Sequence, residues 1–106
     1  MEHFMKDDAL GYFVQRIREQ LDNNLKRIIL FGSKARGDDV VGSDYDCLVI
    51  VDAVSRKIND IVDKVAGETL YQYNIVFSVV LISEEKYNRQ IYNPLLMNIN
   101  KEGTIL

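Results

Sequence analysis

The feature that most constrains this chain is a polar, glycine-bearing stretch that lies between two short and mostly apolar runs. The runs are residues 27–31 and 47–51, and the stretch between them reads GSKARGDDVVGSDYD. Short apolar runs bounded by turn residues are typical of buried β-strands. The pattern therefore predicts two neighbouring core strands with polar groups gathered where they are connected, which is a common way to build a functional site.

The rest of the chain alternates between helical and strand patterns. In residues 7–23, apolar side chains recur at three- and four-residue spacing, which predicts an amphipathic helix that begins at Asp7 or Asp8. The predicted strands are residues 25–31, 45–51 and 75–82. The predicted helices that follow the first one are residues 55–70 with Ser55 as the cap, a short helix from Ser83, and a last helix capped by Asn93 with Pro94 at its first position. We expect an α/β fold in which helices pack on a small mixed sheet of about three strands.

Length and charge restrict the class of protein. The 106 residues predict a single domain, residues 1–106, and the formal net charge of −3 argues against stable binding to nucleic acid, which needs clustered Lys and Arg. No apolar stretch approaches the ~20 residues needed to span a bilayer. The first residues, MEHFMKDD, do not form the apolar segment of a signal peptide. We expect a cytoplasmic protein that does not bind membranes.

The glycine-serine pair at the end of the first strand suits phosphate binding. Gly32 can adopt positive φ and lets backbone N–H groups approach an anion closely. Ser33 is a good N-cap for a short helix that begins at Lys34, and a helix N-terminus directs free N–H groups toward a phosphate.

Two aspartates at the start of the second strand suit a metal ion. Asp44 and Asp46 are two residues apart, so in an extended chain both carboxylates project from one face. Two like charges in that arrangement are costly without a cation, and hard oxygen ligands of this kind suit Mg²⁺, which also takes phosphate oxygens. The alternative is a polar loop whose aspartates only cap and turn the chain.

The combination of these residues resembles a known family. Gly32 and Ser33 are followed, after ten residues, by Asp44-Tyr45-Asp46. This is similar to the signature of the minimal nucleotidyltransferases of the DNA polymerase beta superfamily, which include antitoxin-type members paired with HEPN-type toxins. The specific motif that carries the resemblance is about fifteen residues long. The length of the chain and the order of its predicted helices and strands extend the resemblance over most of the chain.

The resemblance implies a site, a cofactor and a reaction. Gly32 and Ser33 would hold the terminal phosphates of a nucleoside triphosphate, and Asp44 and Asp46 would be catalytic and would ligate Mg²⁺. Lys34 and Arg36 lie within the motif and are expected to add phosphate contacts, although Arg36 could equally pair with a motif aspartate. Relatives of this kind transfer a nucleoside monophosphate to a hydroxyl and release pyrophosphate.

One departure from the family pattern leaves two functions open. The family usually carries a third carboxylate on the next core strand, but residues 75–82 contain no acid, and we expect Val76 or Ser78 in its place. Asp38 or Asp39 could supply the acid if the loop folds back. The first hypothesis is Mg²⁺-dependent transfer of AMP from ATP to a protein hydroxyl, as antitoxin to a HEPN-type toxin. The alternative is a catalytically weak or inactive subunit that acts by binding a partner protein.

Association with another chain is a further expectation, compatible with either function. Four tyrosines are expected to be exposed, and tyrosine is enriched in protein interfaces. They are Tyr71, Tyr73, Tyr87 and Tyr92. They indicate a homo-oligomer or a partner-binding surface, unless they instead line the edge of the domain's own core.

Overall fold

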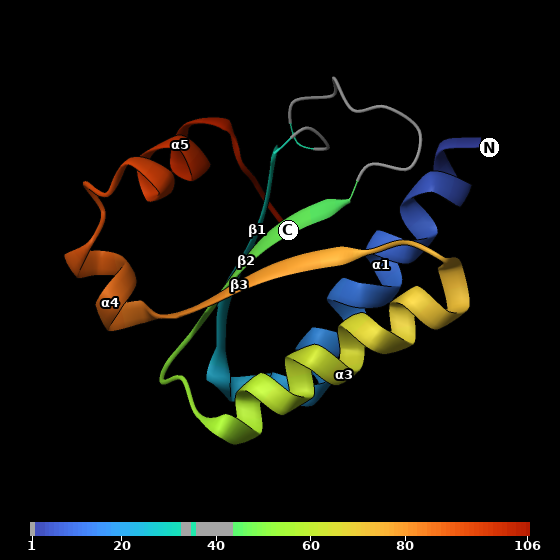
Figure 1. Cartoon of the computed structure of the whole chain (residues 1–106), viewed down its shortest axis with the longest axis horizontal. Helices are drawn as coiled ribbons and strands as arrows, with labels where there is room; N and C mark the ends of the chain where they lie inside the picture. Colours follow the sequence, from blue (N-terminus) through green and yellow to red (C-terminus); the bar gives the residue numbers. More distant parts are fainter. Residues whose placement is uncertain (1, 33–34, 36–43) are drawn as a thin grey trace.

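The computed structural model describes residues 2–32, 35 and 44–106, with side chains described from Asp8 onward. It has three layers, with a mixed sheet between two pairs of helices (Figure 1). Helices α1 (Glu2–Leu21) and α3 (Arg56–Tyr73) pack on one face of the sheet. Helices α4 (Glu84–Arg89) and α5 (Pro94–Glu102) pack on the other face. The predicted α/β class is confirmed.

The sheet has four strands in the order β3-β2-β1-β4. Strand β1 (Leu25–Phe31) is antiparallel to β2 (Tyr45–Val51), which is parallel to β3 (Phe77–Ser83). The fourth strand, β4 (Thr104–Ile105), is short and pairs antiparallel with the middle of β1. The sequence pattern predicted the three main strands but not β4, because two residues are too few to show a periodicity.

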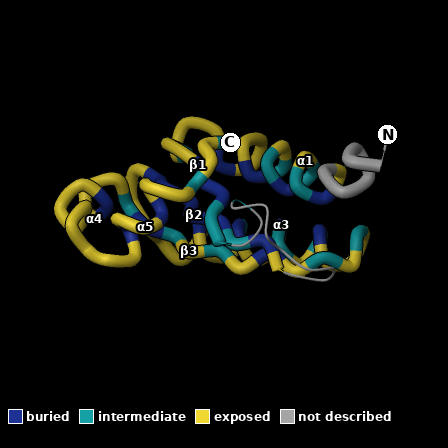
Figure 2. The backbone as a smooth tube through the Cα atoms, turned by 90° about the horizontal axis from the view of Figure 1, so that it is seen from above, coloured by how far each residue is buried: buried dark blue, intermediate teal, exposed yellow. Residues whose placement is uncertain are grey.

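Alternation along β2 divides the core into two layers. Tyr45, Cys47 and Val49 belong to the cluster beneath α1 and α3, whereas Leu48 and Ile50 belong to the cluster beneath α4 and α5. Both sets are buried, as the period of two in a strand covered on both faces requires. Figure 2 shows the buried residues concentrated along the strands and along the inner sides of the helices.

Side chains cap the N-termini of helices α3, α4 and α5. Ser55 accepts a hydrogen bond from the Ile58 N–H at 3.2 Å, and Ser83 accepts one from the Lys86 N–H at 3.1 Å. Asn93 accepts a hydrogen bond from the Leu95 N–H at 2.9 Å, with Pro94 at the first helical position. These three predicted caps are confirmed, since each satisfies an N–H group that has no partner within its helix.

Some predicted boundaries were wrong by a few residues. Helix α1 begins at Glu2, before the predicted caps Asp7 and Asp8, and ends at Leu21, where a 3-10 turn (Asp22–Asn24) follows. Helix α3 continues three residues beyond Leu70 to Tyr73, and its C-cap residue, Asn74, adopts φ 56°. Strand β3 begins at Phe77 rather than at residue 75.

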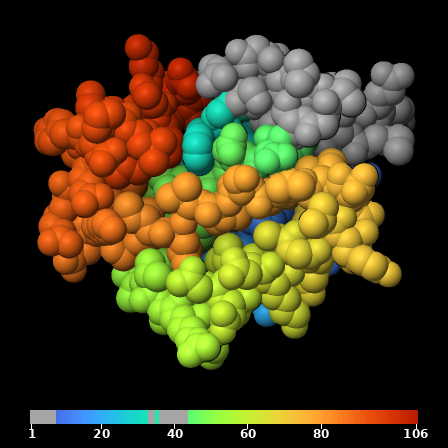
Figure 3. Space-filling view, viewed as in Figure 1, coloured from blue at the N-terminus to red at the C-terminus, as the bar shows by residue number. Residues whose placement is uncertain are grey.

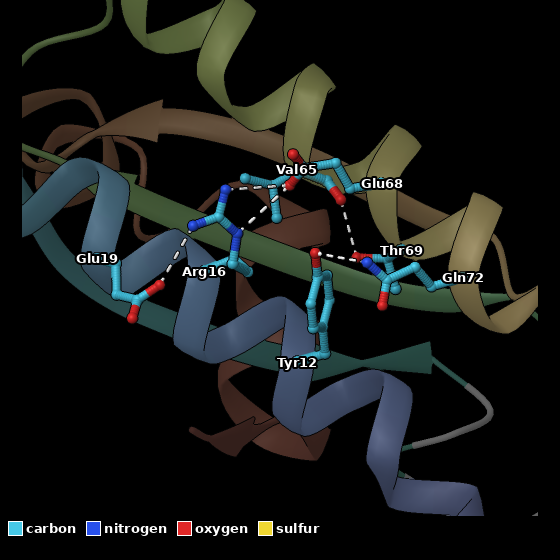
Figure 4. Close-up of polar contacts among 7 residues, drawn as sticks. All are labelled: Tyr12, Arg16, Glu19, Val65, Glu68, Thr69 and Gln72. Carbon is cyan, nitrogen blue, oxygen red and sulfur yellow. Dashed lines mark hydrogen bonds and ion pairs between the residues drawn. The ribbon is translucent and has the colours of Figure 1, made fainter.

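Helices α1 and α3 are joined by polar contacts at the rim of their apolar interface (Figure 4). Arg16 on α1 donates to Glu68 on α3 at 3.3 Å and to Glu19 on its own helix at 3.3 Å. One turn away from Arg16, Gln72 donates to the Tyr12 hydroxyl at 3.2 Å. The buried hydroxyl of Thr69 donates to the Val65 carbonyl at 2.8 Å, so it does not remain unsatisfied in the core.

None of the helices within the described ranges is both long enough and apolar enough to cross a bilayer.

Candidate nucleotide and metal site

The candidate site lies where β1 ends and β2 begins. Phe31, the last residue of β1, is paired with Asp46 near the start of β2, and Gly32 follows Phe31 directly. The antiparallel pairing therefore brings the glycine turn and the second aspartate of the motif side by side, although fourteen positions separate them in the sequence. Figure 1 shows this end of β1 and β2 at the side of the sheet away from α3.

Gly32 is held in a conformation that only glycine adopts easily. Its φ is +75°, and a Cβ atom added to it would overlap carboxylate oxygen Oδ2 of Asp46 and lie 3.2 Å from Cγ. The Asp46 carboxylate thus occupies the space that any other residue at position 32 would fill. The sequence indicated that Gly32 favours the approach of phosphate, but it did not reveal this contact with Asp46, which depends on the strand register.

The two aspartates differ in their surroundings. Asp46 is partly buried and Asp44 is exposed. Burial raises the pKa of the Asp46 carboxyl group, and the negative charge of Asp44 raises it further. Within the described ranges, neither carboxylate has a cationic partner. Two neighbouring carboxylates are an oxygen donor set that suits a hard divalent cation.

Strand β3 forms the other side of the site and carries no acid there. Ser78 is the residue of β3 paired with Asp46, and it is exposed. One residue earlier on β2, the Tyr45 N–H donates to the Val76 carbonyl at 3.0 Å. Of the two positions that the sequence offered for a third carboxylate, the register aligns Ser78 with Asp46. Among the described residues, no three His, Cys, Asp or Glu side chains form a group that could hold a metal ion.

Several predicted site residues lie outside the described part of the chain. They are Ser33, Lys34 and Arg36 of the motif, and Asp38 and Asp39 of the loop that follows. Their proposed contacts with phosphate, or with a metal, therefore stay predictions.

Cys47 follows Asp46 along β2 but faces the other layer. Its side chain is fully buried, and burial together with the charge of Asp46 raises the pKa of its thiol to about 12. Such a thiol is neutral and inert at physiological pH.

The four tyrosines fall into two groups. Tyr71 and Tyr92 are 91% and 84% exposed, as predicted for a binding surface. Tyr87 is buried and its hydroxyl donates to Asn100, so its predicted exposure was wrong. Tyr73 is half-buried against Tyr12, with 5.5 Å between the ring centroids. Tyr87 and Tyr73 therefore contribute to packing within the chain.

The fold and the motif residues define an α/β protein of the nucleotidyltransferase type. The model of the nucleotidyltransferase domain family matches residues 13–105, so this chain belongs to that family. Two proteins of Methanocaldococcus jannaschii, each named "Putative protein adenylyltransferase", are similar to it. One is 33% identical over 101 residues, which cover 95% of this chain and 97% of the relative. The other is 36% identical over 97 residues, which cover 91% and 93%.

Solved structures share the fold at lower sequence identity. A crystal structure of a toxin–antitoxin with AMP-PNP superposes with a TM-score of 0.62 at 18% identity, over 88% of this chain and 68% of that chain. A mutant of the toxin–antitoxin MntA-HpeT superposes with a TM-score of 0.60 at 19% identity, over the same shares. At these identities the likeness establishes the nucleotidyltransferase-like fold.

Proposed function

We propose that this chain transfers AMP from ATP to a hydroxyl group of a protein, and that Asp44 and Asp46 form its catalytic centre. The observation that carries the proposal is the contact between Gly32 and Asp46, which joins the phosphate-binding turn to the carboxylates. The two relatives match this chain over nearly their whole lengths. Their names support adenylyl transfer to a protein.

In this proposal each part of the site has one task. Gly32, Ser33, Lys34 and Arg36 bind and orient the phosphates, and Asp44 and Asp46 hold Mg²⁺. The bound ion would neutralise phosphate charge and favour an in-line displacement. The acceptor hydroxyl oxygen bonds to the α-phosphorus, the bond from that phosphorus to the bridging oxygen breaks, and pyrophosphate leaves while the hydroxyl proton passes to a base.

The partner belongs to the same proposal. We infer that the acceptor is a HEPN-type toxin and that this chain is its antitoxin. The motif resembles antitoxin-type relatives, and the two toxin–antitoxin structures that share the fold are consistent with this partner. ATP is the proposed substrate nucleotide.

A second function is favoured by one specific observation. Ser78 lies opposite Asp46 where the family usually has an acid, and a serine hydroxyl is a poor general base at neutral pH. A positioned base is typically worth about 10²–10⁴ in rate. A chain without one could bind the nucleotide and the partner yet transfer slowly or not at all, and would then act as a binding subunit.

Labelled ATP separates the two functions. The chain is incubated with a HEPN-type protein, Mg²⁺ and ATP labelled at either the α- or the γ-phosphate. Adenylyl transfer labels the partner from α-labelled ATP only, and Asp44→Asn and Asp46→Asn abolish the labelling. Asp60→Asn, on the exposed face of α3, is the matched control and keeps full activity. A tight complex without label supports the binding subunit, whereas labelling that survives both site variants refutes the proposed centre.

A further inference from the structure

Strand β3 is an edge strand without the usual protection against pairing. Among the residues that the structure describes, it is the terminal strand of the sheet, and its seven residues, FSVVLIS, include no charged residue and no proline. Its register with β2 is regular from Phe77 to Ser83, without a bulge. Natural edge strands are usually short, charged, bulged or covered, because a free edge is a template for another strand.

The outer edge of β3 is accessible in the folded chain. In Figure 3, β3 (orange) runs uncovered across the face of the molecule, between α3 and the start of β2. Val80, at the middle of the strand, is 39% exposed, and Ser78 beside it is exposed as well. The surface therefore offers both backbone groups and an apolar side chain to a partner.

The hydrogen-bond alternation identifies which backbone groups are free. The Val76 carbonyl accepts from the Tyr45 N–H, so even-numbered residues of β3 direct their amide and carbonyl groups toward β2. In a parallel ladder the intervening residues direct theirs away from the neighbouring strand. These are Phe77, Val79, Leu81 and Ser83. No residue in the described ranges pairs with this outward row.

We propose that this edge pairs antiparallel with β3 of a second copy of the chain. The two copies are related by a two-fold axis that passes between their Val80 residues. The outward row is symmetric about Val80, so Phe77 would face Ser83 of the second copy and Val79 would face Leu81. All four outward residues of each copy then occupy hydrogen-bonded positions of an antiparallel ladder, whereas any other register leaves an end of the strand unpaired.

The side chains also suit this arrangement. The two Val80 side chains would oppose each other at the axis as a non-hydrogen-bonded pair, where side chains are closest. Because β3 carries no charge, no like charges meet across the axis. The axis is perpendicular to the sheet, so one continuous sheet runs through both copies and both Asp46 carboxylates lie on the same side of it. The dimer does not depend on the proposed chemistry.

Sedimentation equilibrium of the wild-type chain and two lysine variants tests the dimer. We expect the wild-type mass to rise to twice the chain mass of 12.2 kDa with increasing concentration. Val80→Lys should remain at the single-chain mass, because two lysines would meet at the axis. Ile105→Lys is the matched control, since Ile105 is 66% exposed but lies on β4, at the opposite edge of the sheet, and this variant should dimerise as wild type.

Two further measurements keep the test decisive if Val80→Lys folds poorly. Val80→Cys should form an intermolecular disulfide under mild oxidation, whereas Ile105→Cys, at the opposite edge of the sheet, should not. The buried Cys47 should take part in neither case. Amide exchange should slow with concentration at Phe77, Val79 and Leu81, while the intervening amides, already bonded to β2, change little. A chain that stays monomeric at high concentration, or protection without this alternation, overturns the proposal.

Discussion

Replacing Gly32 by alanine tests whether the glycine turn positions the Asp46 carboxylate. The structure predicts two separate effects. The first is backbone strain, because φ of +75° costs a residue with a Cβ atom about 1–2 kcal/mol. The second is steric, because the new Cβ would overlap Oδ2 of Asp46 and force its carboxylate to rotate. Since Oδ2 is at the end of a side chain that can move, the overlap should displace the ligand rather than unfold the chain.

The expected result is therefore a modest loss of stability and a large loss of binding. A destabilisation of 1–2 kcal/mol corresponds to a fall in Tm of about 4–16 °C for a chain of this size. Urea and thermal unfolding measure the stability, and titration calorimetry with Mg²⁺ and a non-hydrolysable ATP analogue measures the binding. Binding should weaken well beyond what the fraction unfolded explains.

A second glycine provides a control of opposite sign. Gly67 lies within α3, and a Cβ added there meets no atom within 4 Å. Gly67→Ala should raise the free energy of unfolding by roughly 0.5–1 kcal/mol, because alanine is the better helix former, and should leave binding unchanged. If Gly32→Ala is as stable as wild type and binds Mg²⁺ and nucleotide equally well, the inferred link between Gly32 and Asp46 is wrong.

Three further predictions concern Ser78, Cys47 and Asp52. Ser78→Asp should raise any AMP transfer rate, by up to the 10²–10⁴ typical of a general base, whereas Ser78→Asn should not; unchanged rates would exclude this position as the place of the missing acid. The thiol of Cys47, whose pKa is raised to about 12, should react with a disulfide reagent at pH 8 roughly 10³-fold faster after unfolding in urea. Hydrogen bonds from Asn24 and from the Ala53 N–H hold the pKa of Asp52 below its usual value. Asp52→Ala should therefore lower the free energy of unfolding at pH 7, and that difference should shrink as the pH falls below about 4; a difference of equal size in acid would contradict the assignment.

Sequence patterns predicted the parts of this fold whose cause is local. The caps Ser55, Ser83 and Asn93 follow from side-chain hydrogen bonds to nearby N–H groups, and the three main strands follow from runs of apolar residues. Strand β4 could not be predicted in this way, because its two residues show no periodicity and their position beside β1 depends on tertiary packing. The burial of Tyr87 was missed for a similar reason, since its hydrogen-bond partner, Asn100, lies on another helix.

The candidate site shows the same division. The types and spacing of Gly32, Asp44 and Asp46 predicted phosphate and metal chemistry. The backbone freedom of glycine and the oxygen atoms of aspartate follow from the residue type alone. The contact of Gly32 with Asp46 and the alignment of Ser78 with Asp46 depend on strand register, which no local pattern determines.

The sheet face that carries Asp46 is only partly covered, and this determines where the proposed substrates can bind. At the far end of that face, Ile50 and Ile82 are buried beneath α4 and α5. At the near end, Asp46 is partly exposed and Ser78 is exposed, so the described helices leave this end of the face accessible. A nucleotide held by the glycine turn and an acceptor hydroxyl would have to meet there, on the side of Asp46 where β3 lies. Residues at the start of β3 are therefore placed to contact the acceptor, and a serine at position 78 leaves room for it while providing no charge of its own.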